Sequence, residues 1–333
     1  MKAVVITKAG GPEVLQLREV PAPQPAAGEI LVRVRAAGVN RADILQRMGQ
    51  YPAPPGAPVD IPGLEYAGEV AALGTGALAW NVGDSVMGLV PAGAYAERVT
   101  VNESLALRVP SGWSFEQAAA VPEAFITAHD ALFRQMRLQA GERLLIHAVG
   151  SGVGTAALQL AKAFGVRTFG TSRSAAKLER ARALGLEVAI DSSREDFATV
   201  IQRHTGGEGV DVVLDLVGGP VLAGSIQALS RGGRMIVVGL TGGRNASIDL
   251  GAVLSKRLAI VGTVLRARSL EEKIGVTAHF AADVLPLLEG GIVRPVVERC
   301  YPLAQAAEAH RRLESDAVFG KLVLRCDEAA GGG

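Results

Sequence analysis

The first third of the chain alternates apolar and polar residues with a period of two. Residues 29–35 follow this pattern after two further expected strands at residues 3–7 and 15–20, and residues 66–73 and 82–88 continue it with glycines at their corners. Such alternation predicts antiparallel strands with one face on a core. Clustered prolines exclude regular helix from the loops between these strands. The pattern therefore predicts a partly open β-barrel.

From residue 143 the pattern changes to short apolar runs that alternate with segments of helical period. In residues 153–164, for example, the apolar side chains fall on one helix face. Repeated β-α-β units predict a parallel, doubly wound sheet that binds its ligand beyond the carboxyl ends of the strands. The expected strands are residues 144–148, 166–171, 188–190, 212–216, 235–238 and 258–264.

The last part of the chain predicts helices around residues 270–288 and 303–313 and a strand at residues 321–324. A segment with only two helices and one strand is not expected to form a domain of its own. We expect it to return and complete the N-terminal barrel, so that the parallel sheet is inserted in the middle. The predicted domains are residues 1–122 with 266–333, and residues 123–265.

Charge and cysteine content exclude several classes of protein. The chain has 34 Lys and Arg residues against 33 Asp and Glu residues, without a long block of one sign, which argues against nucleic acid or a membrane as partner. Cys300 and Cys326 form no CxxC pair, which argues against a disulfide framework and favours a reducing cytoplasm. No segment reaches the ~20 consecutive apolar residues of a membrane helix. The glycine-rich end, residues 327–333, is expected to be a disordered tail.

A glycine-rich turn connects the first strand and the first helix of the second pattern. Its residues are Gly150, Ser151, Gly152, Val153 and Gly154. Glycines allow a sharp turn, close approach to a pyrophosphate and tight packing of helix on strand, and the helix N-terminus supplies free N–H groups. This context predicts dinucleotide binding, with a structural turn that binds no ligand as the alternative.

The next predicted strand ends without the carboxylate that NAD-binding proteins usually place about twenty residues beyond the glycine turn. Ser172 and Arg173 are found there instead, and Lys177 follows within about one helical turn. Hydroxyl groups and a guanidinium suit a 2′-phosphate, so the sequence favours NADPH over NADH. The alternative is that Ser172 or Ser174 only caps the helix and that Arg173 is solvated.

Short motifs distributed along residues 1–325 carry a resemblance to a known superfamily. They are Gly38-Val39-Asn40-Arg41-Ala42-Asp43, Gly49-Gln50-Tyr51, Gly63-Leu64-Glu65-Tyr66-Ala67-Gly68, Val82-Gly83-Asp84, Pro122-Glu123-Ala124, Ser151-Gly152-Val153-Gly154 and Phe319-Gly320-Lys321. The chain resembles the medium-chain dehydrogenase/reductase superfamily, and within it the zinc-free, zeta-crystallin-like NADPH:quinone oxidoreductases of the stress-inducible branch. The resemblance implies an α/β fold in which a GroES-like, partly open β-barrel catalytic domain is joined to a doubly wound Rossmann cofactor domain.

The resemblance also implies a reaction without a metal. Zinc-dependent alcohol dehydrogenases of this superfamily carry a cysteine ligand at the position of Asn40 and a histidine at that of Leu64, and neither ligand is present here. The five histidines form no cysteine-rich or His-x₃-His pattern. Without a metal the acceptor should take hydride readily, which favours a quinone or a conjugated carbonyl over simple alcohol chemistry.

Asn40 and Tyr51 are the predicted hydrogen-bond donors to the acceptor oxygen, because the resemblance places their region against the nicotinamide. Asp43 is expected to orient one of them. A turn-forming asparagine and a half-buried loop aromatic are the alternatives. The resemblance places further residues around the nicotinamide and its ribose, with the last two closing over the cofactor: Thr127, Gly239, Leu240, Thr263, Val264, Leu265, Gly320 and Lys321.

Several functional questions stay open at this point. An enone reductase, an enoyl-thioester reductase and a catalytically silent NADPH-binding protein are the alternatives to a quinone reductase. A homodimer is expected, because residues 258–264 would form an apolar edge strand that invites pairing with a second copy. Glu123, beside Pro122 at a predicted helix start, is interpreted as a structural carboxylate that offsets the helix dipole.

Overall fold

The chain, described here from a computed structural model over residues 1–326, divides into two compact units. Unit 1 comprises Met1–Ile126, Arg266–Gly291 and Pro295–Gly333, and unit 2 comprises Thr127–Leu265 and Ile292–Arg294. The expected domains differ from these units at residues 123–126 and 292–294. The predicted disordered tail, residues 327–333, lies outside the described residues. No helix within residues 1–326 is both long and apolar enough to cross a bilayer.

Unit 1 is built mainly on antiparallel strands. They are β1 (Lys2–Ile6), β2 (Leu15–Glu19), β3 (Glu29–Val39), β4 (Glu65–Leu73), β5 (Ser85–Leu89), β6 (Arg98–Asn102), β7 (Ala106–Arg108), β14 (Val297–Pro302) and β15 (Lys321–Arg325). A seven-stranded sheet has the order β14-β15-β3-β4-β5-β7, with β6 paired to β3, and β1 pairs separately with β2. Only β14 and β15 run parallel within the large sheet.

The pairing of β15 with β3 joins the C-terminal part of the chain to the N-terminal sheet. Leu322 lies opposite Val39 in this antiparallel pair. On β3, Ile30 and Val32 are buried in the core while Arg33 is exposed, as expected for a strand with one face on a core. The pairing brings the start of β15 next to the end of β3, where the candidate site of this unit is found.

Short helical segments connect the strands of unit 1. They are η1 (Pro12–Val14), α1 (Arg41–Arg47), η2 (Glu103–Leu105), α2 (Phe115–Ala118), the π-helix η3 (Pro122–Ile126), α9 (Leu270–Asp283), α10 (Leu285–Glu289), η5 (Leu303–Gln305) and α11 (Ala306–Glu314). The prediction of a single helix around residues 270–288 is wrong, since the two helices α9 and α10 occupy this segment. Pro286 has no N–H for the helical ladder, so α9 ends and α10 begins around Val284.

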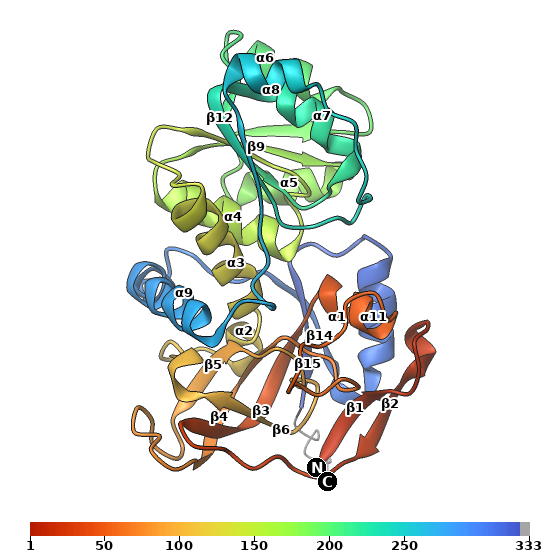
Figure 1. Cartoon of the computed structure of the whole chain (residues 1–333), viewed down its shortest axis with the longest axis vertical. Coiled ribbons are helices and arrows are strands. Elements are labelled where there is room, and N and C mark those ends of the chain that lie inside the picture. Colours follow the sequence, from red (N-terminus) through yellow and green to blue (C-terminus); the bar gives the residue numbers. More distant parts are fainter. Residues whose placement is uncertain (327–333) are drawn as a thin grey trace. The chain divides into compact units, whose positions relative to one another are not determined.

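Unit 2 is a parallel sheet with helices between its strands (Figure 1). The strand order is β10-β9-β8-β11-β12-β13, formed by β8 (Arg143–Ile146), β9 (Arg167–Ser172), β10 (Val188–Asp191), β11 (Val210–Asp215), β12 (Leu229–Val237) and β13 (Ala259–Gly262). The intervening helices are α3 (Thr127–His129), η4 (Asp130–Gln135), α4 (Gly152–Ala163), α5 (Ala175–Ala183), α6 (Phe197–His204), α7 (Gly219–Ala228) and α8 (Leu250–Lys256).

The strand order of unit 2 reverses beside β8. Chain connections run outward through β9 and β10 on one side, and β11, β12 and β13 follow on the other. In doubly wound sheets, ligands bind at the carboxyl ends of the strands at this reversal. The glycine-rich turn follows β8 directly, so the fold places it at the position where a ligand is expected. The predicted doubly wound fold is confirmed.

Candidate functional site

The glycine-rich turn of unit 2 presents unpaired backbone donors. Gly152 and Val153 occupy the first two helical positions of α4, where N–H groups have no acceptor within the helix and lie at the positive end of its dipole. Ser151 caps the helix, since its Oγ accepts a hydrogen bond from the N–H of Gly154 at 3.1 Å. A Cβ on Gly154 would lie 2.6 Å from the carbonyl oxygen of Ala148, so this position requires glycine. The turn therefore fits an anionic phosphate.

The end of β9 lies beside this turn. The N–H of Val149 donates to the carbonyl oxygen of Thr171 at 3.0 Å, which ties the two segments together. Ser172 ends β9, Arg173 is exposed, and the Oγ of Ser174 accepts from the N–H of Lys177 at 3.4 Å to cap α5. One serine thus has the capping role that the sequence left open as an alternative. A hydroxyl, a guanidinium and an ammonium still follow one another here, and their role in binding a 2′-phosphate stays a prediction.

The remaining predicted cofactor residues of unit 2 mostly follow strands. Gly239 and Leu240 come after β12, and residues 263–265 come after β13, the neighbouring parallel strand. Leu240 and Val264 are about half exposed, whereas the Oγ of Thr263 accepts from the amide of Gln135 at 2.7 Å. Thr127, the first residue of α3, is buried. The assignment of these residues to a cofactor stays a prediction.

In unit 1, a buried ion pair holds the side chain of Asn40. The ammonium of Lys321 lies 2.6 Å from the carboxylate of Glu65, with 5% and 0% of the two side chains exposed. The same carboxylate oxygen accepts from the Nδ2 of Asn40 at 2.8 Å, and Lys321 donates to the Oδ1 of Asn40. Lys321 also donates to the carbonyl oxygen of Val39 at 3.1 Å. These contacts fix which end of the Asn40 amide faces the cation and which faces the carboxylate.

Asp43 anchors the backbone of Asn40 rather than its side chain. One carboxylate oxygen of Asp43 accepts from the Asn40 N–H at 2.8 Å and from the Tyr95 hydroxyl at 3.0 Å. The other accepts from the N–H of Gly63 at 3.2 Å. Burial raises the pKa of Asp43 to about 6, although these hydrogen bonds act in the opposite direction.

A chain of buried polar groups leads away from Asp43. The Nδ1 of His310 lies 3.3 Å from the Nη1 of Arg47, and its Nε2 lies 3.2 Å from the Tyr95 hydroxyl. Because an arginine can only donate, Nδ1 accepts and Nε2 carries the proton, which it donates to Tyr95. Burial and the charge of Arg47 lower the pKa of His310 to about 3, so this histidine is neutral.

Tyr51 is held by Arg266. The guanidinium lies over the tyrosine ring at 4.9 Å and donates to the Tyr51 carbonyl oxygen at 3.0 Å. It also donates to the carbonyl oxygen of Pro91 and to the side chain of Gln46. The Tyr51 hydroxyl, by contrast, forms no hydrogen bond within residues 1–326. This half-buried donor is therefore available to a ligand.

The comparisons with known proteins identify the family. Residues 26–111 match the alcohol dehydrogenase GroES-like domain and residues 152–280 match the family described as zinc-binding dehydrogenase. Quinone oxidoreductase from Rattus norvegicus is 33% identical over 327 residues, which cover 97% of each chain. Quinone oxidoreductase from Pseudomonas aeruginosa is 35% identical over 324 residues, which cover 97% of this chain and 99% of the relative.

The chain belongs to the quinone oxidoreductase family of medium-chain dehydrogenases/reductases. The structure of Escherichia coli quinone oxidoreductase complexed with NADPH matches this family member with a TM-score of 0.88 and 32% identity, covering 98% of this chain and 100% of that one. CurK enoyl reductase matches with a TM-score of 0.86 and 28% identity over 97% and 98% of the two chains. The predicted family and α/β fold are confirmed.

This family member has an apolar residue where its zinc-dependent relatives are expected to carry a histidine. Leu64 is 3% exposed and precedes Glu65, and Asn40 is bonded to Lys321 and Glu65. Among residues 1–326, no group of three or more His, Cys, Asp or Glu side chains could hold a metal ion. An ammonium and an amide therefore occupy the region in which the relatives would place zinc ligands.

Of the two residues predicted to close over the cofactor, Gly320 and Lys321, the second has a structural role in unit 1. Gly320 directly precedes β15, and the ammonium of Lys321 binds Glu65, Asn40 and a backbone carbonyl. The cofactor role of both residues stays a prediction. Sequence reasoning missed the ion pair because its partners lie far apart in the chain. A carboxylate inside the apolar stretch around Glu65 was the available signal, because such a residue needs a buried partner.

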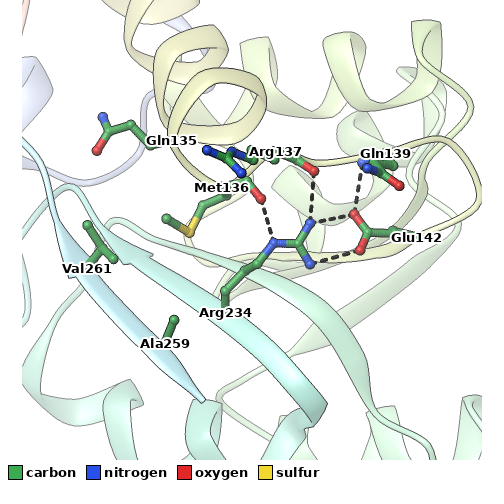
Figure 2. Close-up of a pocket in the computed structure, with 8 residues that line it drawn as sticks. All are labelled: Gln135, Met136, Arg137, Gln139, Glu142, Arg234, Ala259 and Val261. Atoms are coloured by element: carbon green, nitrogen blue, oxygen red, sulfur yellow. Dashed lines mark hydrogen bonds and ion pairs between the residues drawn. The ribbon is translucent and has the colours of Figure 1, made fainter. Parts of the chain in front are cut away.

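A surface pocket of unit 2 contains none of the predicted site residues. It measures about 490 Å³ and lies beside β13, where Ala259 and Val261 line it (Figure 2). The guanidinium of Arg234, one of two arginines on its lining, pairs with Glu142 at 2.7 Å and donates to the carbonyl oxygens of Met136 and Arg137. These contacts use most of the donors of Arg234, so the cation that the pocket presents to solvent is the exposed side chain of Arg137.

Proposed function

We propose that this chain is an NADPH-dependent quinone oxidoreductase that reduces its acceptor without a metal. NADPH, when bound, supplies the hydride. The names of the curated relatives support a quinone acceptor, and the Escherichia coli relative complexed with NADPH supports this cofactor. The turn and the β9 end fit the cofactor, with the N–H groups of Gly152 and Val153 for the pyrophosphate and Ser172, Arg173 and Lys177 for the 2′-phosphate.

One observation carries the acceptor chemistry. The Oδ1 of Asn40 accepts from Lys321 and one of the two N–H groups of its amide donates to Glu65, which leaves the second N–H to donate to a ligand. The Tyr51 hydroxyl is a second available donor. Donors that are already oriented stabilise the negative charge that develops on a quinone or enone oxygen as it accepts hydride. We assign both donors to that oxygen.

The experiment is steady-state NADPH oxidation with ortho- and para-quinones, conjugated enones and enoyl thioesters. We expect turnover with quinones, and a higher kcat/KM for them than for enoyl thioesters. An enoyl reductase is the second candidate, supported by the similarity to CurK enoyl reductase, and a preference for thioesters would replace our proposal with it. Binding of NADPH without turnover of any acceptor would indicate a catalytically silent protein.

We also propose a cytoplasmic homodimer. β13 is an edge of the parallel sheet, and its Ile260 is exposed, so its free backbone groups can pair with the same strand of a second copy. Cys300 and Cys326 form no disulfide within residues 1–326, which agrees with a reducing compartment. Light scattering at micromolar concentration should give twice the chain mass, and a monomer alone would contradict the dimer.

A further inference from the structure

We propose that Glu123 is the acid that protonates the reduced acceptor, an inference that rests on the proposed function. The N–H of Glu123 donates to one carboxylate oxygen of Glu65 at 2.8 Å, while the other oxygen of Glu65 binds Asn40 and Lys321. Glu65 thus links the backbone of Glu123 directly to the amide that we assign to the acceptor oxygen. Glu123 and Tyr51 also act on each other electrostatically, so the second assigned donor has this carboxyl nearby.

The local backbone around Glu123 is unusual. Residues Pro122–Ile126 form a π-helix, a rare conformation that occurs frequently at functional sites. The Glu123 side chain is half-buried, and its carboxyl group forms no hydrogen bond or ion pair with any residue from 1 to 326. A carboxylate that only offsets a helix dipole would not need this placement beside a buried ion pair. The structure therefore favours a chemical role over the structural role expected from the sequence.

The charges that face Glu123 come from several elements. Glu65 on β4 and Asp43 on α1 are acidic, whereas Lys321 on β15 and Arg266 are basic. Burial, followed by the charge of Glu65, raises the pKa of Glu123 to about 8, and the two cations counteract only part of this effect. At neutral pH the group is therefore mostly protonated and can give up a proton, as a general acid must.

The proton step balances the hydride step. The cofactor is oxidised and the acceptor is reduced by the hydride, which leaves one negative charge on the acceptor. The O–H bond of Glu123 then breaks, and its proton forms a new bond to the anionic oxygen of the quinol or to the α-carbon of an enolate. The carboxylate that remains takes a proton from water, which can reach this side chain because it is not fully buried.

The first test measures the protonation of Glu123 without cofactor or turnover. Protein labelled with ¹³C at the glutamate carboxyl carbon is titrated by NMR, and the Glu123 signal is assigned by its loss in Glu123→Gln. We expect a midpoint near pH 8. A midpoint in the ordinary range of glutamate, about 4.3, would overturn the proposal. Exposed Glu289 supplies the internal reference, through its own loss in Glu289→Gln.

The second test separates Glu123 from the proposed function. With an enone acceptor, Glu123→Gln should lower kcat about a hundredfold and leave the Kd for NADPH unchanged, because only the acid is lost. The wild-type rate should fall as the pH rises through about 8, and this alkaline limb should disappear in the variant. The matched variant Glu289→Gln should keep both the rate and the limb.

Each failure has its own signature. An unchanged kcat and alkaline limb in Glu123→Gln would overturn the acid role even if the NMR midpoint is high. A wild-type protein that reduces no acceptor would overturn the proposed function and this inference together. Glu123→Asp, which keeps an acid on a shorter side chain, should recover part of the rate. A higher rate in Glu123→Asp than in Glu123→Gln would show that the acid, and not the packing of the side chain, accounts for the loss.

Discussion

The two units build their sites in opposite ways. In unit 2, the groups that suit a phosphate are backbone N–H groups and side chains that follow one another within short stretches, at Gly152 and Val153 and again at Ser172–Lys177. In unit 1, side chains from separate elements converge, and Glu65 and Lys321 are 256 positions apart but 2.6 Å from each other. Local geometry determines the first site, whereas tertiary packing and burial determine the second.

The largest expected effect comes from breaking the buried pair of unit 1. Lys321→Met leaves Glu65 buried without a counter-charge, which should lower the free energy of unfolding by about 3–5 kcal/mol. Fluorescence reports on unit 1 alone, because Trp80 and Trp113 are the only two tryptophans of the chain. Denaturant unfolding followed by this signal measures the change.

A matched exposed pair supplies the control for that variant. Arg167 and Glu187 in unit 2 form an ion pair with 54% and 44% of their side chains exposed, so Arg167→Met should cost less than about 1 kcal/mol by circular dichroism. The double variant Lys321→Met/Glu65→Leu should regain most of the stability lost in Lys321→Met. Equal losses in Lys321→Met and Arg167→Met would contradict the account of unit 1.

The next effect concerns the two donors of unit 1. Tyr51→Phe and Asn40→Ala should each raise the activation barrier for an enone by about 3 kcal/mol, because each removes one donor to the developing oxyanion. The Kd for NADPH should stay the same. An electron-poor quinone should lose less, since its oxygen needs less stabilisation. If both variants turn over the enone at the wild-type rate, these residues have structural roles only.

The corresponding substitution in unit 2 should act on binding alone. Arg173→Ala removes a charge-assisted contact to the 2′-phosphate, which contributes about 1.5–3 kcal/mol, or roughly ten- to a hundredfold in affinity. Binding of NADH should not change, and Ser172 and Lys177 can compensate in part. The measurement is the ratio of the two dissociation constants, and the same ratio in wild type and variant would make Arg173 a surface residue without this role.

A smaller expected effect is the pH dependence of folding stability, which differs between the two units. His147 in unit 2 is buried between the hydroxyls of Thr171 and Ser225, and burial lowers its pKa to about 3. The unfolded chain binds a proton below pH 6.5 that the folded chain does not, so stability falls as the pH falls from 6.5 towards 3. At pH 5 the loss should be about 2 kcal/mol.

Matched histidine variants isolate this contribution. His147→Gln should flatten the pH dependence of unit 2, whereas His204→Gln, at an exposed position of the same unit, should leave it unchanged. Hydrogen-exchange protection of β8 and β11, corrected for intrinsic rates, reports on this unit. In unit 1 the loss from His310 is opposed by Asp43 and Glu123, whose raised pKa values make stability rise on acidification.

The sequence predicted those parts of the molecule that are determined by residues close to one another in the chain. Alternation and helical period were enough for both sheets, and the glycine turn was found from its position between a strand and a helix. The split of residues 270–288 into two helices could have been read from Pro286. In the site of unit 1, Asn40, Asp43 and Tyr51 were singled out through a family resemblance, because no local pattern distinguishes them.

What the sequence could not predict depends on burial. Nothing in its local context shows that Glu65 pairs with Lys321, or that Arg266 holds the ring and carbonyl of Tyr51. For Glu123 the local pattern favoured a dipole-offsetting role, because the neighbouring charge and the desolvation that raise its pKa come from elements distant in the chain. Tertiary contacts alone show which partners these residues have.

The central claim is that unit 1 supports reduction with an amide, a hydroxyl and an acid in place of a metal. The most direct measurement is the metal content of the purified chain together with its rate of NADPH oxidation by para-benzoquinone before and after dialysis against a chelator. We predict far less than one zinc per chain and an unchanged rate. One zinc per chain, with a rate that chelation abolishes and added zinc restores, would contradict the claim.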